Sequence, residues 1–174
     1  ADHVVHGSVV LPSSVFVELA VRAGDELGCT VLQELVAGPP LVLPQGTGVE
    51  LQVRVGEPGP AGRSVSVHAR PGGADVPWTL HAQGRLGAEA PAGEPDVGPW
   101  PPAGAEAMDP AELYERLTRS GMRHGAAFRT VTAVWRSGAE VFAELGLPEK
   151  EASDAAEYVL HPALLDAALH PAYA

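Results

Sequence analysis

The sequence has 174 residues, 45% of them hydrophobic, and its 22 acidic and 11 basic residues give a formal net charge of −11 at pH 7. This charge argues against nucleic acid or an anionic membrane as the main partner, and no apolar run approaches the roughly 20 residues that span a bilayer. The single cysteine, Cys29, excludes an internal disulfide framework and predicts a reducing, cytoplasmic location.

The first predicted elements are an extended segment and a helix. Residues 3–12 are short or β-branched and predict a strand or extended segment that ends at Pro12, after which Ser13 or Ser14 can cap a helix. The apolar residues of this helix recur at helical spacing and stop before Gly28: Val15, Phe16, Leu19, Ala20, Ala23 and Leu27.

A sheet is predicted next, because five strand-like runs alternate with Gly/Pro turns. The runs cover residues 31–36, 41–43, 49–55, 65–69 and 78–86. One helix followed by antiparallel strands that wrap it predicts an α+β fold. Residues 87–110 are rich in Ala, Gly, Pro and acidic side chains, and this composition is typical of a linker.

The remaining residues predict a second helix, a hairpin and a short third helix. Asp109 caps the second helix, with Pro110 at its first position, and Gly121 ends it. The hairpin pairs 127–136 with 140–147, and the third helix covers 160–171. Its apolar residues are expected to face the core: Leu164, Leu165, Ala168 and Leu169. Strand, helix and sheet therefore occur twice, the second copy cut short after its helix.

The third helix carries the first candidate for chemistry. Asp166 and His170 are four residues apart and therefore neighbours on one helical face. A carboxyl group among leucines and alanines is costly unless it is paired, neutral or functional. His3, far away in sequence, is the second candidate. On their own, His3 can also be a structural histidine and Asp166 a buried partner of an arginine.

The other histidines support weaker expectations. His3 and His6 point to opposite faces of a strand, and Asp166 with His170 lacks an evident third ligand, so no metal site is predicted. We expect His161 to cap the third helix and His124 to be a partly exposed loop residue.

Three motifs occur in order along the chain: His3-x3-Gly7-x4-Pro12, then Gly121-Met122-Arg123-His124-Gly125-Ala126-Ala127-Phe128, then Leu160-His161-Pro162-Ala163-Leu164-Leu165-Asp166-Ala167-Ala168-Leu169-His170. Together they resemble the dehydratase domain of modular type I polyketide synthases, over essentially the whole chain. The resemblance implies a double hotdog, in which two long helices are each wrapped by an antiparallel sheet. Residues 1–86 would then be the first hotdog, carrying His3, 87–110 a linker, and 111–174 a truncated second hotdog, carrying Asp166.

The resemblance also implies an activity, the dehydration of a 3-hydroxyacyl thioester to the 2-enoyl thioester. Neutral His3 would take the C2 proton, and Asp166 would protonate the departing hydroxide if its apolar surroundings keep it protonated. Alternatively, His3 ends with a proton that it shares with Asp166. His170 and His124 are expected to support the pair. The expected substrate-binding residues are Gly7, Leu11, Pro12, Gly125, Phe128 and Leu165, with a backbone N–H near Gly7 facing the enolate oxygen.

The implied partners follow from the same family. The substrate would be carried on the phosphopantetheine arm of an acyl carrier protein, and the domain would need no cofactor of its own. Neighbouring synthase domains and a second copy of the chain are expected to contact it.

One departure from the family pattern keeps other functions open. His124-Gly125-Ala126 stands where family members usually carry Tyr-Gly-Pro. This difference makes a variant reaction plausible, such as double-bond isomerisation or cyclisation by addition of a hydroxyl group to the enoyl product. A non-catalytic structural remnant is a further alternative, although such a remnant has no chemical need for both His3 and Asp166.

Overall fold

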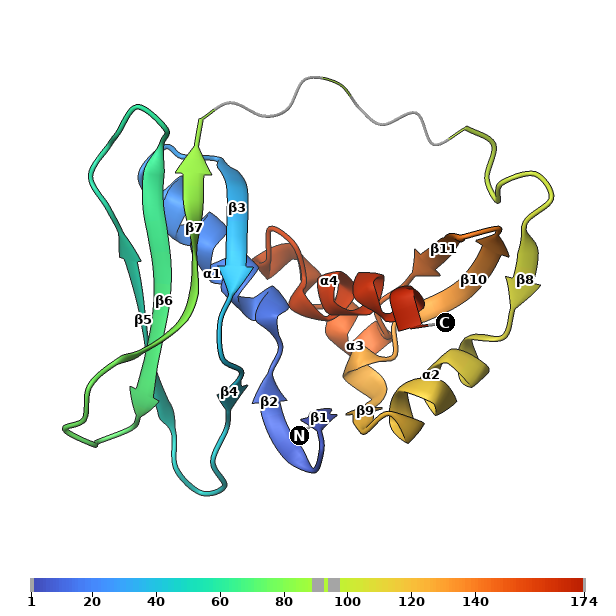
Figure 1. Cartoon of the computed structure of the whole chain (residues 1–174), viewed down its shortest axis with the longest axis horizontal. Coiled ribbons are helices and arrows are strands. Elements are labelled where there is room, and N and C mark those ends of the chain that lie inside the picture. The colour runs from blue at the N-terminus through green and yellow to red at the C-terminus, as the bar shows by residue number, and fades with distance from the viewer. Residues whose placement is uncertain (1, 89–92, 94–97, 174) are drawn as a thin grey trace. The chain divides into compact units, whose positions relative to one another are not determined.

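A computed structural model describes residues 2–88, 93 and 98–173. The chain forms two compact units, Ser8–Pro91 and Ala1–Gly7 together with Ala92–Ala174 (Figure 1). Each unit combines helices with antiparallel strands, which confirms the predicted α+β class. The first seven residues group with the second unit because β1 (His3–Val5) pairs with β9 (Met122–His124). His3 therefore lies in the same unit as Asp166, and the predicted hotdog boundaries stay a prediction.

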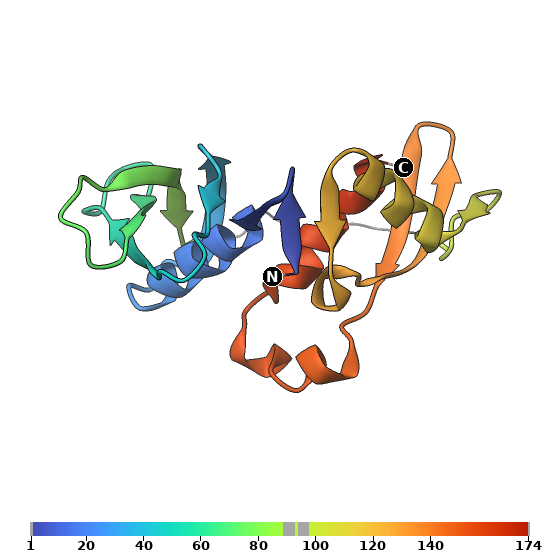
Figure 2. The same cartoon turned by 90° about the horizontal axis from the view of Figure 1, so that it is seen from below.

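The unit Ser8–Pro91 packs one helix, α1 (Ser13–Asp25), on an antiparallel sheet of order β3-β7-β6-β5 (Figures 1 and 2). A separate short ladder pairs β2 with β4. The strand bounds are β2 Ser8–Leu11, β3 Val31–Ala37, β4 Leu41–Val42, β5 Val49–Val55, β6 Arg63–Pro71 and β7 Thr79–Gly87. The five predicted strand-like runs correspond to β3 through β7.

The core of this unit lies between α1 and one face of the sheet. Phe16 packs with Val67 of β6, and Ala20 packs with Val65 and Leu86. Alternate residues of β6 are buried, as expected for a strand with one face on the core.

Two details at the start of the chain correct the predictions. The single strand predicted over 3–12 is wrong, because His6 and Gly7 form a turn with φ of 46° and 83° that separates β1 from β2. The predicted serine cap is also wrong. Pro12, in an extended conformation, occupies the N-cap of α1, and Ser14 is buried inside the helix.

The second unit surrounds its core with α2 (Pro110–Arg119), α4 (Pro162–Leu169) and a sheet of order β11-β10-β8. The predicted hairpin is present as β10 (Val131–Ser137) and β11 (Glu140–Leu145). Asp109 caps α2 as predicted, because its carboxylate accepts a hydrogen bond of 2.8 Å from the N–H of Ala111. The remaining short elements are β8 Glu106–Met108, η1 Ala126–Phe128, α3 Glu149–Ala152, η2 Ala155–Glu157 and η3 His170–Tyr173.

The linker prediction for 87–110 is wrong in its last residues. β8 lies there and pairs with β10, with Met108 opposite Val134, and Met108 packs against the core. A three-residue strand is too short to produce a visible alternation in the sequence.

The core of the second unit also corrects the prediction for the third helix. Leu113 and Leu117 of α2 pack with Val134 and with Ala167 of α4. The buried face of α4 consists of Pro162, Ala163 and Ala167, whereas Leu169 is 57% exposed. Small side chains face the core here, so the larger leucines are turned partly or fully outward.

Between β11 and α4 the chain makes an excursion that the sequence analysis did not predict. It contains α3 and η2 and extends outward from its unit (Figure 2). Among the described residues, no helix has the length and apolar character required to cross a membrane.

Candidate active site

The pairing of β1 with β9 positions two histidines. In this antiparallel ladder His3 lies directly opposite His124, and directly opposed residues project from the same face. Their ring centroids are 5.4 Å apart. His124 therefore belongs to a strand, and the prediction that it is a loop residue is wrong. Its pairing partner is 121 residues away, so local sequence could not reveal it.

Glycines at both ends of β9 permit this close pairing. The N–H of His6 donates to the carbonyl of Gly121 at 2.8 Å, and the N–H of Gly125 donates to the carbonyl of Asp2 at 2.7 Å. Gly121 has a φ of +89°, and a Cβ atom there would collide with the His6 ring. At Gly125 a Cβ atom would lie 2.6 Å from the Asp2 carboxyl group.

Two hydrogen bonds hold the first turn of α4, which immediately precedes Asp166. His161 caps the helix as predicted, because its Nδ1 accepts a hydrogen bond of 3.2 Å from the N–H of Ala163. The hydroxyl of Thr130, which is fully buried, donates to the carbonyl of Ala163 at 3.4 Å. Thr130 immediately precedes β10, so this bond ties α4 to the sheet one turn before Asp166.

The two oxygens of Asp166 face different histidines. His3 Nε2 lies 4.0 Å from Oδ1, and His170 Nε2 lies 3.1 Å from Oδ2. The side chains of His3 and Asp166 are only 14% and 13% exposed. Within the described part of the chain, Asp166 forms its ion pairs with the imidazoles of His3 and His170. The alternative expectation, that Asp166 is the buried partner of an arginine, is wrong.

Aromatic rings enclose these groups. The ring of His124 lies 4.2 Å from that of His170, and the ring of Phe128 lies 5.6 Å from that of His3. Tyr114 of α2 contacts both His124 and His170 edge-on, at 6.1 Å and 5.7 Å.

Tyr114 also fixes the backbone near the site, a role that sequence analysis missed. Its hydroxyl donates to the carbonyl of Phe128 at 3.4 Å and accepts from the N–H of Val131 at 3.2 Å. On sequence alone Tyr114 is only one of several apolar positions of an amphipathic helix. No local signal distinguishes a core tyrosine that also supports a site.

Burial determines the charge of two of these groups. It lowers the pKa of His124 from 6.5 to about 4; the nearby His170 and His3 act in the same direction, and Asp166 opposes them. Burial also raises the pKa of Tyr114 above its ordinary value of 10.0. At neutral pH, His124 is therefore a neutral imidazole and Tyr114 a neutral phenol.

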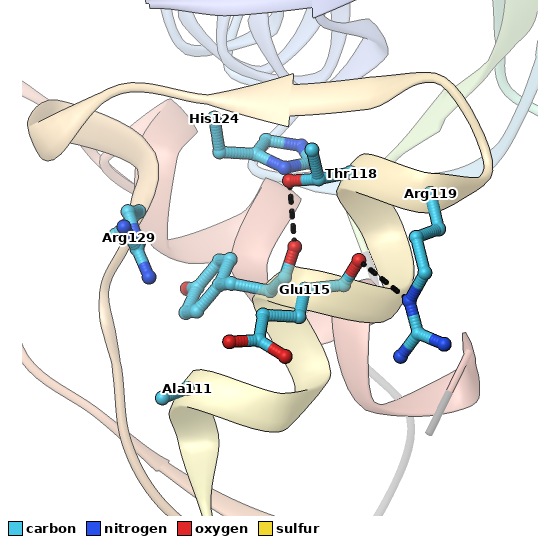
Figure 3. A pocket seen from close by; sticks show the side chains of 7 residues that line it. Ala111, Glu115, Thr118, Arg119, His124 and Arg129 are labelled. Atoms are coloured by element: carbon cyan, nitrogen blue, oxygen red, sulfur yellow. Dashed lines mark hydrogen bonds between the residues drawn. The ribbon is translucent and has the colours of Figure 1, made fainter.

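A groove of about 500 Å³ opens beside His124 (Figure 3). The Arg119 side chain donates to a carbonyl of α2, and the Arg129 guanidinium lies 4.7 Å above the ring of Tyr114. His124 contributes a wall from β9. The lining residues are Ala111, Tyr114, Glu115, Thr118, Arg119, His124 and Arg129.

The other predicted binding residues are distributed unevenly. Leu165 is half-buried on α4 beside Asp166, whereas Gly7 lies in an exposed turn. The N–H of Gly125 is already bonded to Asp2. Leu11 and Pro12 belong to the other unit, at the end of β2 and at the N-cap of α1. Their roles in binding stay predictions.

The site also brings together possible metal ligands. His3, His124 and Asp166 each offer one donor atom, and these atoms all lie within 4.8 Å of one another. This group differs from the pair of Asp166 and His170 considered from the sequence, because it contains His3 and His124 in place of His170.

Comparison with known proteins identifies the family. The family model for the polyketide synthase dehydratase N-terminal domain matches residues 92–174, and that for the polyketide synthase dehydratase domain matches residues 1–70. Polyketide synthase GfsB of Streptomyces halstedii is 50% identical over 99% of this chain, which spans only 3% of that protein.

Solved structures give the same result. A structure from work on dehydratase substrate selection in the borrelidin and fluvirucin polyketide synthases is 50% identical, with a TM-score of 0.90 over 98% of this chain and 61% of its own. A bifunctional dehydratase-cyclase domain from ambruticin biosynthesis is 47% identical, with a TM-score of 0.84 over 97% of this chain and 60% of its own. These matches confirm the predicted family and its hotdog fold class.

Proposed function

This chain belongs to the dehydratase domains of polyketide synthases, and on that basis we propose that it removes water from a 3-hydroxyacyl thioester to give the 2-enoyl thioester. The substrate is carried on the phosphopantetheine arm of an acyl carrier protein. The observation that supports this most is the pair of His3 Nε2 and Asp166 Oδ1, 4.0 Å apart in a largely buried site. The pair provides the proton acceptor and the proton donor that the elimination needs.

His3 acts as the base. A neutral imidazole nitrogen that faces the substrate can take the proton from C2, next to the thioester carbonyl. The ladder with β9 and the ring of Phe128 hold His3 in place. The enolate that forms needs a hydrogen-bond donor, for which the N–H of Gly7 stays the candidate because that of Gly125 is already used.

Asp166 acts as the acid. Its Oδ1, which faces His3, carries the proton that leaves with the hydroxide as water. His170 donates from Nε2 to Oδ2 and so directs Oδ1 toward the substrate. His3 takes the C2 proton to give the enolate, and the C3–O bond then breaks as the double bond forms, leaving imidazolium and carboxylate. Proton transfer from His3 back to Asp166 over 4.0 Å completes the cycle.

Both steps are proton transfers, so the reaction needs no cofactor beyond the arm that carries the substrate. Phe128 and Leu165 offer apolar surface beside the pair for the acyl chain. The carrier protein, the neighbouring synthase domains and a second copy of the chain are the proposed partners.

The test uses the full-length synthase polypeptide with a 3-hydroxyacyl group loaded on its carrier protein. We expect a product lighter by one water. The variants His3→Phe and Asp166→Asn should each lower the rate by about 10²–10⁴-fold, because each removes one proton-transfer group. His6→Asn and Asp154→Asn are matched controls at exposed positions of the same unit. Unchanged dehydration in both His3→Phe and Asp166→Asn would contradict the proposal.

One alternative has specific support. The ambruticin relative is a dehydratase-cyclase, and this chain carries His124-Gly125-Ala126 in place of the family's usual Tyr-Gly-Pro. The same pair can transfer protons during addition of a distant hydroxyl group to the enoyl double bond. An enoyl thioester with such a hydroxyl group would then give a product of unchanged mass that no longer absorbs as a conjugated thioester.

A further inference from the structure

Three side chains of the site converge on a space that suits one cation. The donor atoms of His3, His124 and Asp166 all lie within 4.8 Å of one another. A tetrahedral zinc ion with bonds of about 2.0–2.2 Å holds its ligands about 3.3–3.6 Å apart. The 4.0 Å between His3 Nε2 and Asp166 Oδ1 needs to shorten by only about half an ångström. The other two pairs of donor atoms lie at most 4.8 Å apart and would need to close by up to about 1.5 Å.

The donor set selects a class of metal. Two imidazoles and a carboxylate suit zinc, iron(II), copper and nickel, whereas magnesium and calcium prefer oxygen ligands alone. Three protein ligands leave a fourth position for water or for an oxygen of another molecule.

The surroundings of the three ligands also fit a metal site. His170 binds the second oxygen of Asp166 at 3.1 Å, and such an outer partner fixes the orientation of a ligating carboxylate. Nδ1 of His124 is buried and has no hydrogen-bond partner among the described residues. A buried polar atom without a partner costs free energy. Because Nδ1 of His124 has no partner among the described residues, binding of an ion by this ring breaks no hydrogen bond of that atom.

We propose that His3, His124 and Asp166 bind one divalent transition-metal ion, such as Zn²⁺, and that this ion inhibits the enzyme. The bound ion occupies the lone pair of His3 and an oxygen of Asp166, so neither can transfer a proton. The inhibition rests on the proposed function, whereas the binding does not. Family members that carry tyrosine in place of His124 lack one of the two imidazole ligands.

The binding test compares full-length synthase variants by equilibrium dialysis against micromolar Zn²⁺, after removal of bound metal with EDTA. The wild-type protein should retain one more zinc ion per chain than His124→Phe. Loss of an outer partner alone costs about 10–100-fold in metal affinity, so His124→Phe should weaken this site at least that much. Asp166→Asn, which is similar in shape to the wild-type residue, should show the same loss, and His6→Asn should show none.

A spectroscopic signature assigns the ligands independently of stoichiometry. Co²⁺ in place of Zn²⁺ should give a visible absorption band in the wild-type protein and in His6→Asn, but not in His124→Phe. Equal zinc content, equal affinity and equal cobalt spectra in wild type and His124→Phe would overturn the proposed site.

The activity test is separate. Micromolar Zn²⁺ should stop dehydration by the wild-type protein, and EDTA should restore it. The dehydration that remains in His124→Phe should need at least about 10-fold more Zn²⁺ for half inhibition. Binding without inhibition would overturn the inhibitory role. If the metal-free protein does not dehydrate at all, the proposed function fails, and the dialysis result still decides the metal site.

Discussion

At the scale of single residues, the site depends on the different contacts of the two carboxylate oxygens of Asp166. Oδ1 faces His3 and Oδ2 faces His170, so in the proposed mechanism one oxygen transfers the proton while the other is held. The i, i+4 spacing of Asp166 and His170 was visible in the sequence, and the hydrogen bond between them confirms that prediction. The approach of His3 depends on a strand pairing that no spacing reveals.

His170 should act as a positioning residue and not as a proton donor to the substrate. His170→Gln keeps an N–H that can reach Asp166 and should retain most of the activity. His170→Leu removes that donor and should lower kcat by about 10–100-fold, with little change in KM. Measured kcat and KM for the two variants test this role, and equal losses in both would indicate a purely structural effect.

His124 should make the stability of the domain sensitive to acid. The unfolded chain protonates His124 near pH 6.5, but the folded protein does so only near its lowered pKa of about 4. Between these values the unfolded state binds more protons, so stability falls as the pH falls through this window. We expect the free energy of unfolding of the wild type, relative to His124→Phe, to fall by about 1–2 kcal/mol from about pH 7.5 to about pH 4.5. This magnitude allows for partial solvent screening beside the groove.

Urea denaturation of both proteins at the two pH values measures this difference. The comparison cancels the titration of groups that the two proteins share. A constant difference between them would show that His124 titrates normally in the folded protein.

At the scale of elements, α4 shows why apolar pattern alone misjudges a short helix. Its leucines are larger than its alanines, yet Ala163 and Ala167 face the core and Leu169 faces outward. These small residues fit against a core that contains Leu113 and Leu117 of α2 and Val134 of β10. Hydrophobicity ranks leucine above alanine, and only packing against the surrounding core reverses that order.

Adjacent alanines of α4 provide a matched test. Ala167 is fully buried in the core, whereas Ala168 is exposed. Ala167→Leu should overpack the core and lower the free energy of unfolding by about 1–3 kcal/mol. Ala168→Leu adds the same atoms at the surface and should change it by less than about 0.5 kcal/mol. Chemical denaturation of the two variants gives the comparison, and similar losses in both would contradict the assigned buried face.

At the scale of the whole molecule, the candidate active site of the second unit is assembled from distant parts of the sequence. β1 supplies His3, and α4 supplies Asp166, 163 residues later in the chain. In the proposed mechanism the base and the acid are 4.0 Å apart. Groups this close reach a hydrogen and a hydroxyl group on adjacent carbons only when both leave from the same face of the substrate. The elimination should therefore be syn.

Substrates labelled with deuterium at one or the other C2 position test this stereochemistry. The deuterium that lies syn to the hydroxyl group should be lost, and its diastereomeric counterpart should be retained in the enoyl product. Mass spectrometry of the two products distinguishes the outcomes. Loss of the anti deuterium would mean that the two groups act from opposite faces.

The sequence by itself determined the features that depend on neighbouring residues. The cap of α2 at Asp109, the cap of α4 at His161, the strands β3 through β7 and the hairpin of β10 and β11 follow from local chemistry and periodicity. The family resemblance likewise rests on three motifs, each of which is continuous in the chain. Local steric and hydrogen-bonding preferences act over a few residues, so they can be recognised without a fold.

Only the tertiary structure decided which distant residues meet. It paired β1 with β9, placed His124 opposite His3 and brought Tyr114 and His170 against that imidazole. It also buried the alanines of α4 in preference to Leu169. These contacts depend on long-range strand pairing and on the volumes that fit together in a core, and neither quantity is a property of any single stretch of sequence.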